Sequence, residues 1–160
     1  MQTSADTAII YHSGTVPGPA NPDAKRYSAE YWGDTEAQAL SVFGRMESSF
    51  EKLGVDFGDV IKMTVFLVGD PALEGRMDFS GFMRAYTQYF GTDEQPNLPA
   101  RSAVQVAGLA SPGMLVEVES YTRPARITAS VLSPAARNLR RRLNRHCVRE
   151  PARRSGSRTR

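Results

Sequence analysis

Residues 34–68 read DTEAQALSVFGRMESSFEKLGVDFGDVIKMTVFLV, and this stretch decides the fold. Its first part carries apolar residues at helical spacing, namely Ala39, Phe43, Met46, Phe50 and Leu53. Asp34 suits the N-cap and Gly54 the position just past the C-terminus, so we predict a helix between them. Residues 60–68 are rich in β-branched side chains, and polar residues alternate there with apolar ones. That alternation predicts a strand with one buried face.

The flanking segments complete an α+β pattern. Upstream, residues 9–11 predict a short strand that is ended by Ser13-Gly14, and a proline-rich loop follows it. Downstream, the patterns predict a helix and two strands, over residues 77–90, 101–107 and 114–122 respectively. The order strand, helix, strand, helix, strand, strand indicates one mixed sheet with both helices packed on one face. The other face then needs cover, which oligomerisation supplies most simply.

Charge divides the chain into two parts. Residues 1–122 hold 8 Lys and Arg against 16 Asp and Glu, a net charge of −8, whereas residues 123–160 hold 12 Arg and one acid, a net charge of +11. We therefore predict one domain over 1–122 and a disordered Arg-rich tail over 123–160, because the tail has few large apolar residues to bury. Two interpretations of the tail stay open. It is an electrostatic arm for nucleic acid or an acidic partner, or an incidental extension of the kind that a shifted GC-rich reading frame produces.

Several classes of protein are excluded by composition. The longest apolar run, residues 63–68, is far too short to span a bilayer. The first residues lack the basic and apolar regions of a signal peptide, so we expect a cytoplasmic protein. The single cysteine, Cys147, allows no internal disulfide. His12 and His146 lie far apart without ligand spacing, so we expect no metal site.

Three places along the chain offer chemistry. Arg101 opens a predicted strand directly after a Pro-containing connector, where a guanidinium can present paired N–H donors to a carboxylate or phosphate. The alternative is a rim arginine paired with a nearby acid. Glu117 alternates with valines, so if the valines face the helices, Glu117 faces solvent or a subunit interface. Ser13-Gly14 offers a hydroxyl and a backbone N–H, or forms an ordinary turn.

Four stretches resemble the RidA (YjgF-type) family of imine deaminases. They are SGTVP at 13–17, GDVIKMTVFL at 58–67, AYTQYF at 85–90 and, most specifically, PARSAVQVAGLASPGMLVEVE at 99–119. The resemblance extends over roughly residues 9–122 and leaves out the tail. It implies a chorismate-mutase-like fold and a homotrimer with sites between subunits. It also implies hydrolysis of reactive enamines and imines, such as 2-aminoacrylate and 2-iminopropanoate, to 2-keto acids and ammonia without a cofactor.

The resemblance assigns roles residue by residue. Arg101 matches the family arginine that grips the substrate carboxylate, and Glu117 matches the glutamate that positions the attacking water. Ser13 and Gly14 match the pair that lines the pocket. Ala103 stands where many members have a cysteine, and we expect it to contribute backbone groups to substrate binding.

The chain also departs from the family pattern. Met83 stands where many members have an asparagine, and the turn at 110–113 is one residue longer. Too few residues precede Ile9 for the usual first strand with its pocket tyrosine. Either the natural start lies further upstream, or this edge of the site is built differently.

Two other functions stay open. One is a non-catalytic sensor that binds small 2-keto acids through Arg101 and turns nothing over. The other is a ribonuclease or nucleic-acid binder, a label that some family members carry. The acidic domain disfavours nucleic-acid binding, whereas the Arg-rich tail favours it. Binding that vanishes when the tail is removed would not be a property of the fold.

Overall fold

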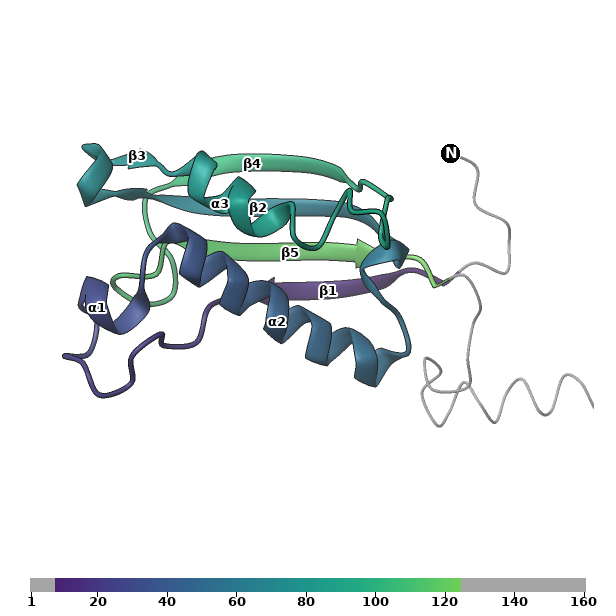
Figure 1. Cartoon of the computed structure of the whole chain (residues 1–160), viewed down its shortest axis with the longest axis horizontal. Helices are drawn as coiled ribbons and strands as arrows, with labels where there is room; N and C mark the ends of the chain where they lie inside the picture. The colour runs from purple at the N-terminus through teal and green to yellow at the C-terminus, as the bar shows by residue number, and fades with distance from the viewer. Residues whose placement is uncertain (1–7, 125–160) are drawn as a thin grey trace, which may run out of the picture. The chain divides into compact units, whose positions relative to one another are not determined.

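The computed structural model describes residues 8–124, so the predicted tail lies outside the described residues except for Arg123 and Pro124 (Figure 1). The elements are, in chain order, β1 (Ile10–Thr15), α1 (Ala29–Trp32), α2 (Thr35–Leu53), the 3-10 turn η1 (Phe57–Asp59), β2 (Val60–Asp70), the 3-10 turn η2 (Pro71–Leu73), β3 (Arg76–Met77), α3 (Phe79–Tyr86), β4 (Ala100–Val106) and β5 (Val116–Thr122). Within this part of the chain, no helix is both long and apolar enough to cross a membrane.

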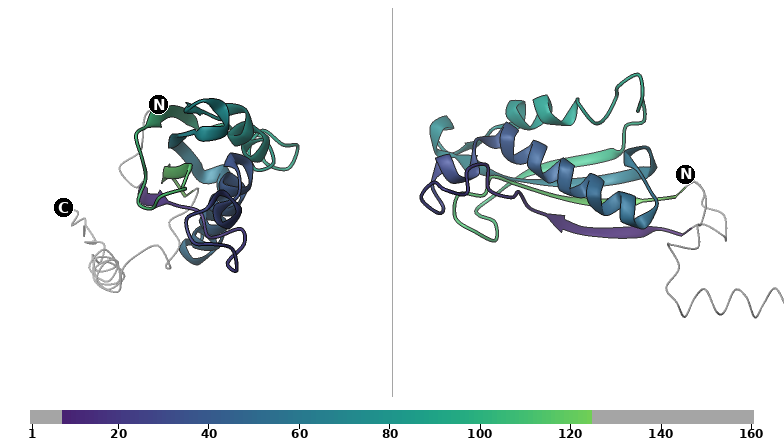
Figure 2. Two further views of the ribbon diagram at one scale, coloured as in Figure 1. Left: turned by 90° about the vertical axis from the view of Figure 1, so that its left-hand side faces the viewer. Right: turned by 60° about the horizontal axis from the view of Figure 1, so that its bottom comes forward.

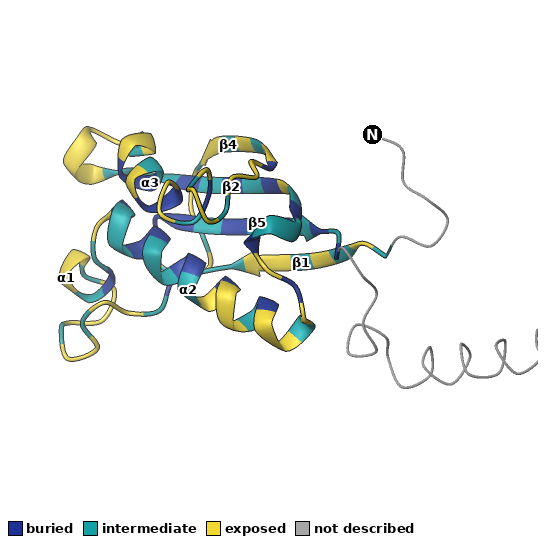
Figure 3. Ribbon diagram, turned by 45° about the vertical axis from the view of Figure 1, so that its right-hand side comes forward, coloured by how far each residue is buried: buried dark blue, intermediate teal, exposed yellow. Residues whose placement is uncertain are grey.

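The sheet has five strands and is mixed, as predicted. β5 lies between β1 and β2 and is antiparallel to both. β4 pairs with β2 in parallel, and the short β3 pairs antiparallel with the end of β2. Figure 2 shows α2 and α3 together on one side of this sheet, which confirms the predicted layers. β4 carries no fully buried residue, whereas β2 and β5 alternate buried with half-buried residues (Figure 3).

The helix α2 forms where the sequence predicts it. The Asp34 carboxylate accepts a hydrogen bond from the Ala37 N–H at 2.8 Å, which satisfies a free donor of the first turn. Gly54 ends the helix in the left-handed conformation, with φ of 70°. The helix buries an apolar stripe against the sheet, made of Ala39, Val42, Phe43, Met46 and Phe50. From the sheet side, the core receives Met63, Val65, Leu67, Val116 and Val118.

Two predicted boundaries are wrong. The second helix is shorter than residues 77–90, because α3 ends at Tyr86 and the next residues form tighter turns, with Tyr89 N–H donating to Tyr86 O at 3.0 Å. The first strand does not stop at Ser13-Gly14. β1 runs on to Thr15, and the pairing with β5 shifts register between His12 and Thr15. The glycine therefore marks an irregularity inside a strand and not its end.

Gln38 ties the start of α2 to the turn before β5. Its side chain is fully buried, its amide nitrogen donates to Gly33 O and Gly113 O at 3.0 Å each, and its carbonyl accepts from Leu115 N–H at 2.7 Å. We expect Gln38→Leu to lower the free energy of unfolding by roughly 3 kcal/mol, because it leaves the buried Leu115 N–H and the partly buried carbonyls of Gly33 and Gly113 without this partner. Urea unfolding would measure this. The exposed Gln88→Leu is the control, and a loss below about 1 kcal/mol for Gln38→Leu would contradict the expectation.

Candidate functional site

Arg101 points to the helix-covered side of the sheet. It is the second residue of β4 and pairs with Met63 of β2, whose side chain is fully buried beneath the helices. Paired residues of neighbouring strands direct their side chains to the same face, so Arg101 reaches from the outer strand toward α3. The buried Pro99 precedes this strand, in agreement with the predicted rigid connector.

The guanidinium of Arg101 lies among three aromatic rings of α3. Its central carbon is 4.1 Å from the ring centroid of Tyr86, 5.6 Å from that of Phe82 and 5.7 Å from that of Phe79. Cation–π attraction at these distances holds the planar group in one orientation and partly removes it from water. We call Phe79, Phe82 and Tyr86 the aromatic cradle. Burial raises the pKa of Tyr86, an effect that the charge of Arg101 partly opposes, so its hydroxyl stays protonated at neutral pH.

The charge of Arg101 has no protein partner among residues 8–124. Its Nη1 is buried without a hydrogen-bond acceptor, and no carboxylate of the described residues pairs with it. The predicted alternative, a rim arginine paired with a nearby acid, therefore does not hold within the described chain. An unsatisfied buried donor costs about 1–3 kcal/mol, more when it is charged. A ligand that carries a carboxylate would satisfy this donor and its neighbours on the same fork.

Glu117 faces the opposite side of the sheet. It pairs with Phe66, between two valines of β5 that are fully buried against the helices. The sequence predicted that Glu117 faces solvent or a subunit interface if the valines of this strand face the helices. The valines do face the helices. Glu117 is half-buried.

The structure brings Gly14 against this glutamate. A Cβ built on Gly14 would overlap Oε1 of Glu117, so only a residue without a side chain leaves the carboxylate where it lies. Ser13 is exposed beside Gly14 in the same irregular part of β1. The predicted site residues therefore form two groups: Ser13, Gly14 and Glu117 lie together, and Arg101 does not join them.

Ala103 belongs to the group of Arg101. It pairs with the buried Val65, and its side chain packs against the core. Only its backbone groups are left for a ligand, and their role in substrate binding stays a prediction. Met83, on α3, also packs against the core.

The aromatic cradle was not predicted from the sequence. Its three residues recur at helical spacing, and such a stripe predicts only a core-facing helix surface. Phe79 is 40% exposed at the start of α3, so the stripe runs beyond the core and reaches the arginine. The sequence contains both an aromatic stripe and an arginine at a strand start. The two can be connected only when their contact in the fold is known.

Comparison with known proteins identifies the family. The model of the family described as endoribonuclease L-PSP matches residues 2–123. The chain belongs to the YjgF/RidA family. It is 30% identical over 112 residues to the 2-iminobutanoate/2-iminopropanoate deaminase of Escherichia coli K12, covering 70% of this chain and 77% of that protein. It is 33% identical over 118 residues to a RutC family protein of Synechocystis, covering 74% of this chain and 80% of that protein.

Solved YjgF/RidA structures share the fold. The structure of TdcF of E. coli with bound serine superposes with a TM-score of 0.56 at 27% identity, covering 77% of this chain and 85% of that one. The YjgF gene product of E. coli superposes with a TM-score of 0.54 at 29% identity, covering 75% and 83%. The α+β fold with a mixed sheet and two helices is thereby that of YjgF structures.

Within residues 8–124, no three His, Cys, Asp or Glu side chains gather closely enough to hold a metal ion.

Proposed function

We propose that this YjgF/RidA-family protein is an imine deaminase. It hydrolyses small 2-imino acids, of the 2-aminoacrylate and 2-iminopropanoate type, to 2-keto acids and ammonia. The observation that carries the proposal is the guanidinium of Arg101, which is oriented by the aromatic cradle and has no acidic partner among the described residues. The E. coli relative named as a 2-iminobutanoate/2-iminopropanoate deaminase supports it.

The proposed mechanism uses positioning and one carboxylate that carries protons. Arg101 holds the substrate carboxylate through two parallel hydrogen bonds, which fixes the adjacent imine carbon. Glu117 accepts a proton from the water that attacks this carbon and returns it to the nitrogen of the resulting amino alcohol. The C–N bond then breaks to release ammonia, while the hydroxyl group becomes the carbonyl and gives up its proton. The protonated imine is already electrophilic, so the reaction needs no cofactor.

The proposed site is built from two copies of the chain. Arg101 and Glu117 lie on opposite faces of one sheet, so one chain does not direct both side chains at one small substrate. In the homotrimer that the family resemblance implies, the edge of one subunit meets the helix-free face of the next. Arg101 of one subunit then approaches Glu117, Ser13 and Gly14 of its neighbour. The exposed Tyr11 and Val104 on the helix-free face gain cover in such an assembly.

Gly14 offers a separate test of the role of Glu117. We expect Gly14→Ala to lower kcat about tenfold or more while leaving the unfolding free energy nearly unchanged, because the new methyl group displaces only the flexible end of the Glu117 side chain. Steady-state kinetics beside urea unfolding would check this. Gly108→Ala, where the added Cβ would meet no atom within 4 Å, is the matched control for the loss of a glycine. Unchanged kinetics in Gly14→Ala would show that the observed position of Glu117 is not needed.

The proposal is tested by ammonia release from 2-aminoacrylate generated in situ. We expect the wild-type protein to accelerate release above the spontaneous rate. A folded oligomer that gives no acceleration with this substrate or with 2-iminobutanoate would overturn the proposal. Saturable binding of a 2-keto acid in that same preparation would point instead to a non-catalytic sensor.

A further inference from the structure

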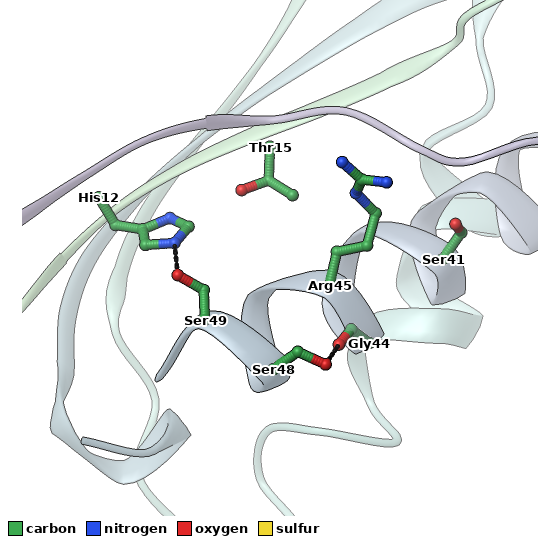
Figure 4. Close-up of a pocket in the computed structure, with 7 residues that line it drawn as sticks. All are labelled: His12, Thr15, Ser41, Gly44, Arg45, Ser48 and Ser49. Atoms are coloured by element: carbon green, nitrogen blue, oxygen red, sulfur yellow. Dashed lines mark hydrogen bonds between the residues drawn. The ribbon is translucent and has the colours of Figure 1, made fainter. Parts of the chain in front are cut away.

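A polar pocket lies between β1 and α2, on the helix-covered side of the sheet and so on the opposite face from Glu117 (Figure 4). Its volume is about 420 Å³, and neither Arg101 nor Glu117 lines it. His12 and Thr15 enter it from the strand, and Arg45 and the serines enter it from the helix. Ser41, Arg45 and Ser48 are three or four residues apart, so one face of α2 presents them together.

Arg45 is the only charged residue in the lining of this pocket. Its guanidinium extends toward Thr15 in Figure 4. It forms no ion pair or hydrogen bond with the described residues, although the segment 1–122 carries a net charge of −8. Arg45 is thus a positive charge at the mouth of a pocket without an acidic partner among the described residues. An anion is the ligand that would neutralise it.

Two hydroxyl-bearing residues, Thr15 of the strand and Ser41 of the helix, lie on either side of Arg45 in Figure 4. The Ser41 Oγ accepts a hydrogen bond from Gly18 N–H at 3.0 Å, so its own proton is free to donate. Thr15 lines the pocket from the strand side; in Figure 4 its methyl group is on the side of Arg45 and its hydroxyl on the side of His12, and rotation to another staggered χ1 position would turn the hydroxyl toward Arg45. His12 forms a fixed wall, because its Nε2 hydrogen-bonds with the Ser49 hydroxyl at 2.9 Å and its ring packs edge-on against Phe50.

Gly44 leaves the floor of the pocket open. A Cβ built on this residue would meet no atom within 4 Å, so the space beside Arg45 extends over the helix backbone. A phosphoryl group alone would not fill the pocket, and the organic part of a phosphate ester has room beside it.

We propose that this pocket binds a phosphate monoester, whose phosphoryl group lies between Arg45 and the hydroxyls of Thr15 and Ser41. Donors that approach from a strand and from a facing helix suit a tetrahedral anion with three terminal oxygens. A planar carboxylate would be satisfied by the guanidinium fork alone and would leave the strand-side hydroxyl unused. The site is independent of the deaminase proposal, since it shares no residue with it.

Binding of inorganic phosphate and of glycerol 3-phosphate to the full-length chain tests this site at constant ionic strength. We expect saturable shifts of the backbone amide signals of Thr15, Ser41 and Gly44 in two-dimensional NMR spectra. Arg45→Gln should weaken both ligands at least about tenfold, because it removes a charge-assisted pair of hydrogen bonds. Thr15→Val should weaken them less, and acetate at the same concentration should leave these signals in place.

Three control variants separate this pocket from other cationic sites of the chain. Arg76→Gln removes an exposed arginine elsewhere, and Arg101→Ala removes the proposed carboxylate site, so both should bind phosphate as the wild type does. Removal of residues 125–160 should likewise leave the three amide shifts unchanged. The proposal is overturned if those amides do not shift, or if binding persists in Arg45→Gln. It is also overturned if binding is lost with Arg101 or with the tail.

Discussion

Arg101→Ala is expected to lower kcat/KM for imine hydrolysis at least about a hundredfold and to leave the oligomeric state of the protein unchanged. The size of this effect follows from two losses. The substrate carboxylate loses a bidentate charged partner, and the imine carbon is no longer held in line with the attacking water. The fold is expected to survive, because the guanidinium forms no hydrogen bond or ion pair with the described residues, although its contact with the rings of the aromatic cradle is lost.

Two further variants decide what the arginine contributes. Arg101→Lys keeps the positive charge but loses the planar fork and much of its contact with Tyr86, so we expect most of the activity to be lost. Arg84→Ala removes an exposed arginine of α3, the helix that carries the aromatic cradle. Arg84 pairs with Glu36, and its loss should leave kcat/KM near the wild-type value. Full activity in Arg101→Lys would show that charge alone is required, and full activity in Arg101→Ala would refute the role of this residue.

Glu117→Gln is expected to lower kcat about 10²-fold to 10⁴-fold with little change in KM. The amide keeps the size and the hydrogen-bonding reach of the carboxylate but accepts no proton from water. In the proposed site, Arg101 and not Glu117 binds the substrate carboxylate, and the two lie on opposite faces of the sheet, so the ground-state complex should form normally. Single-turnover rates beside equilibrium binding of a 2-keto acid would separate the two steps.

Glu119→Gln is the matched control for this substitution. Glu119 lies two residues further along β5, pairs with Thr64 and shares the helix-free face with Glu117. Its replacement changes the charge of that face by the same amount, so its kcat should stay within about threefold of the wild type. An equal loss of activity in both variants would indicate a general electrostatic effect of the face and would contradict a specific role for Glu117.

The main helix and the central strand could be predicted from the sequence because their signals are local. Asp34 and Gly54 cap α2 where the pattern places them. The strand at residues 60–68 was predicted correctly because its β-branched run and its alternating polarity agree. The bulged path of β1 could not be predicted, since Ser13-Gly14 looks like a turn unless the pairing with β5 is known.

The face of β4 that is turned to the core could not be predicted from its sequence. In ARSAVQV the valines would be expected to face the core and the arginine to face outward. The register with β2 reverses this, because Arg101 and Ala103 lie beside the buried Met63 and Val65, and Val104 is left 43% exposed. The valine is typical of a surface that a second copy covers. A single chain therefore carries Arg101 on one face of the sheet and Glu117 on the other. No local sequence pattern shows how these two parts of the proposed site come together.

Mixing two inactive variants shows whether each site is shared between two copies of the chain. Arg101→Ala and Glu117→Gln subunits are unfolded together in equal amounts, refolded into mixed oligomers and assayed for ammonia release. If each site takes Arg101 from one subunit and Glu117 from the next, random assembly should restore about one quarter of the wild-type sites. Recovery near that level, absent when the variants are refolded separately and then combined, is the predicted result. Activity that stays at the level of the parent variants, in oligomers shown to contain both, would mean that each site draws both residues from one chain and would contradict the account.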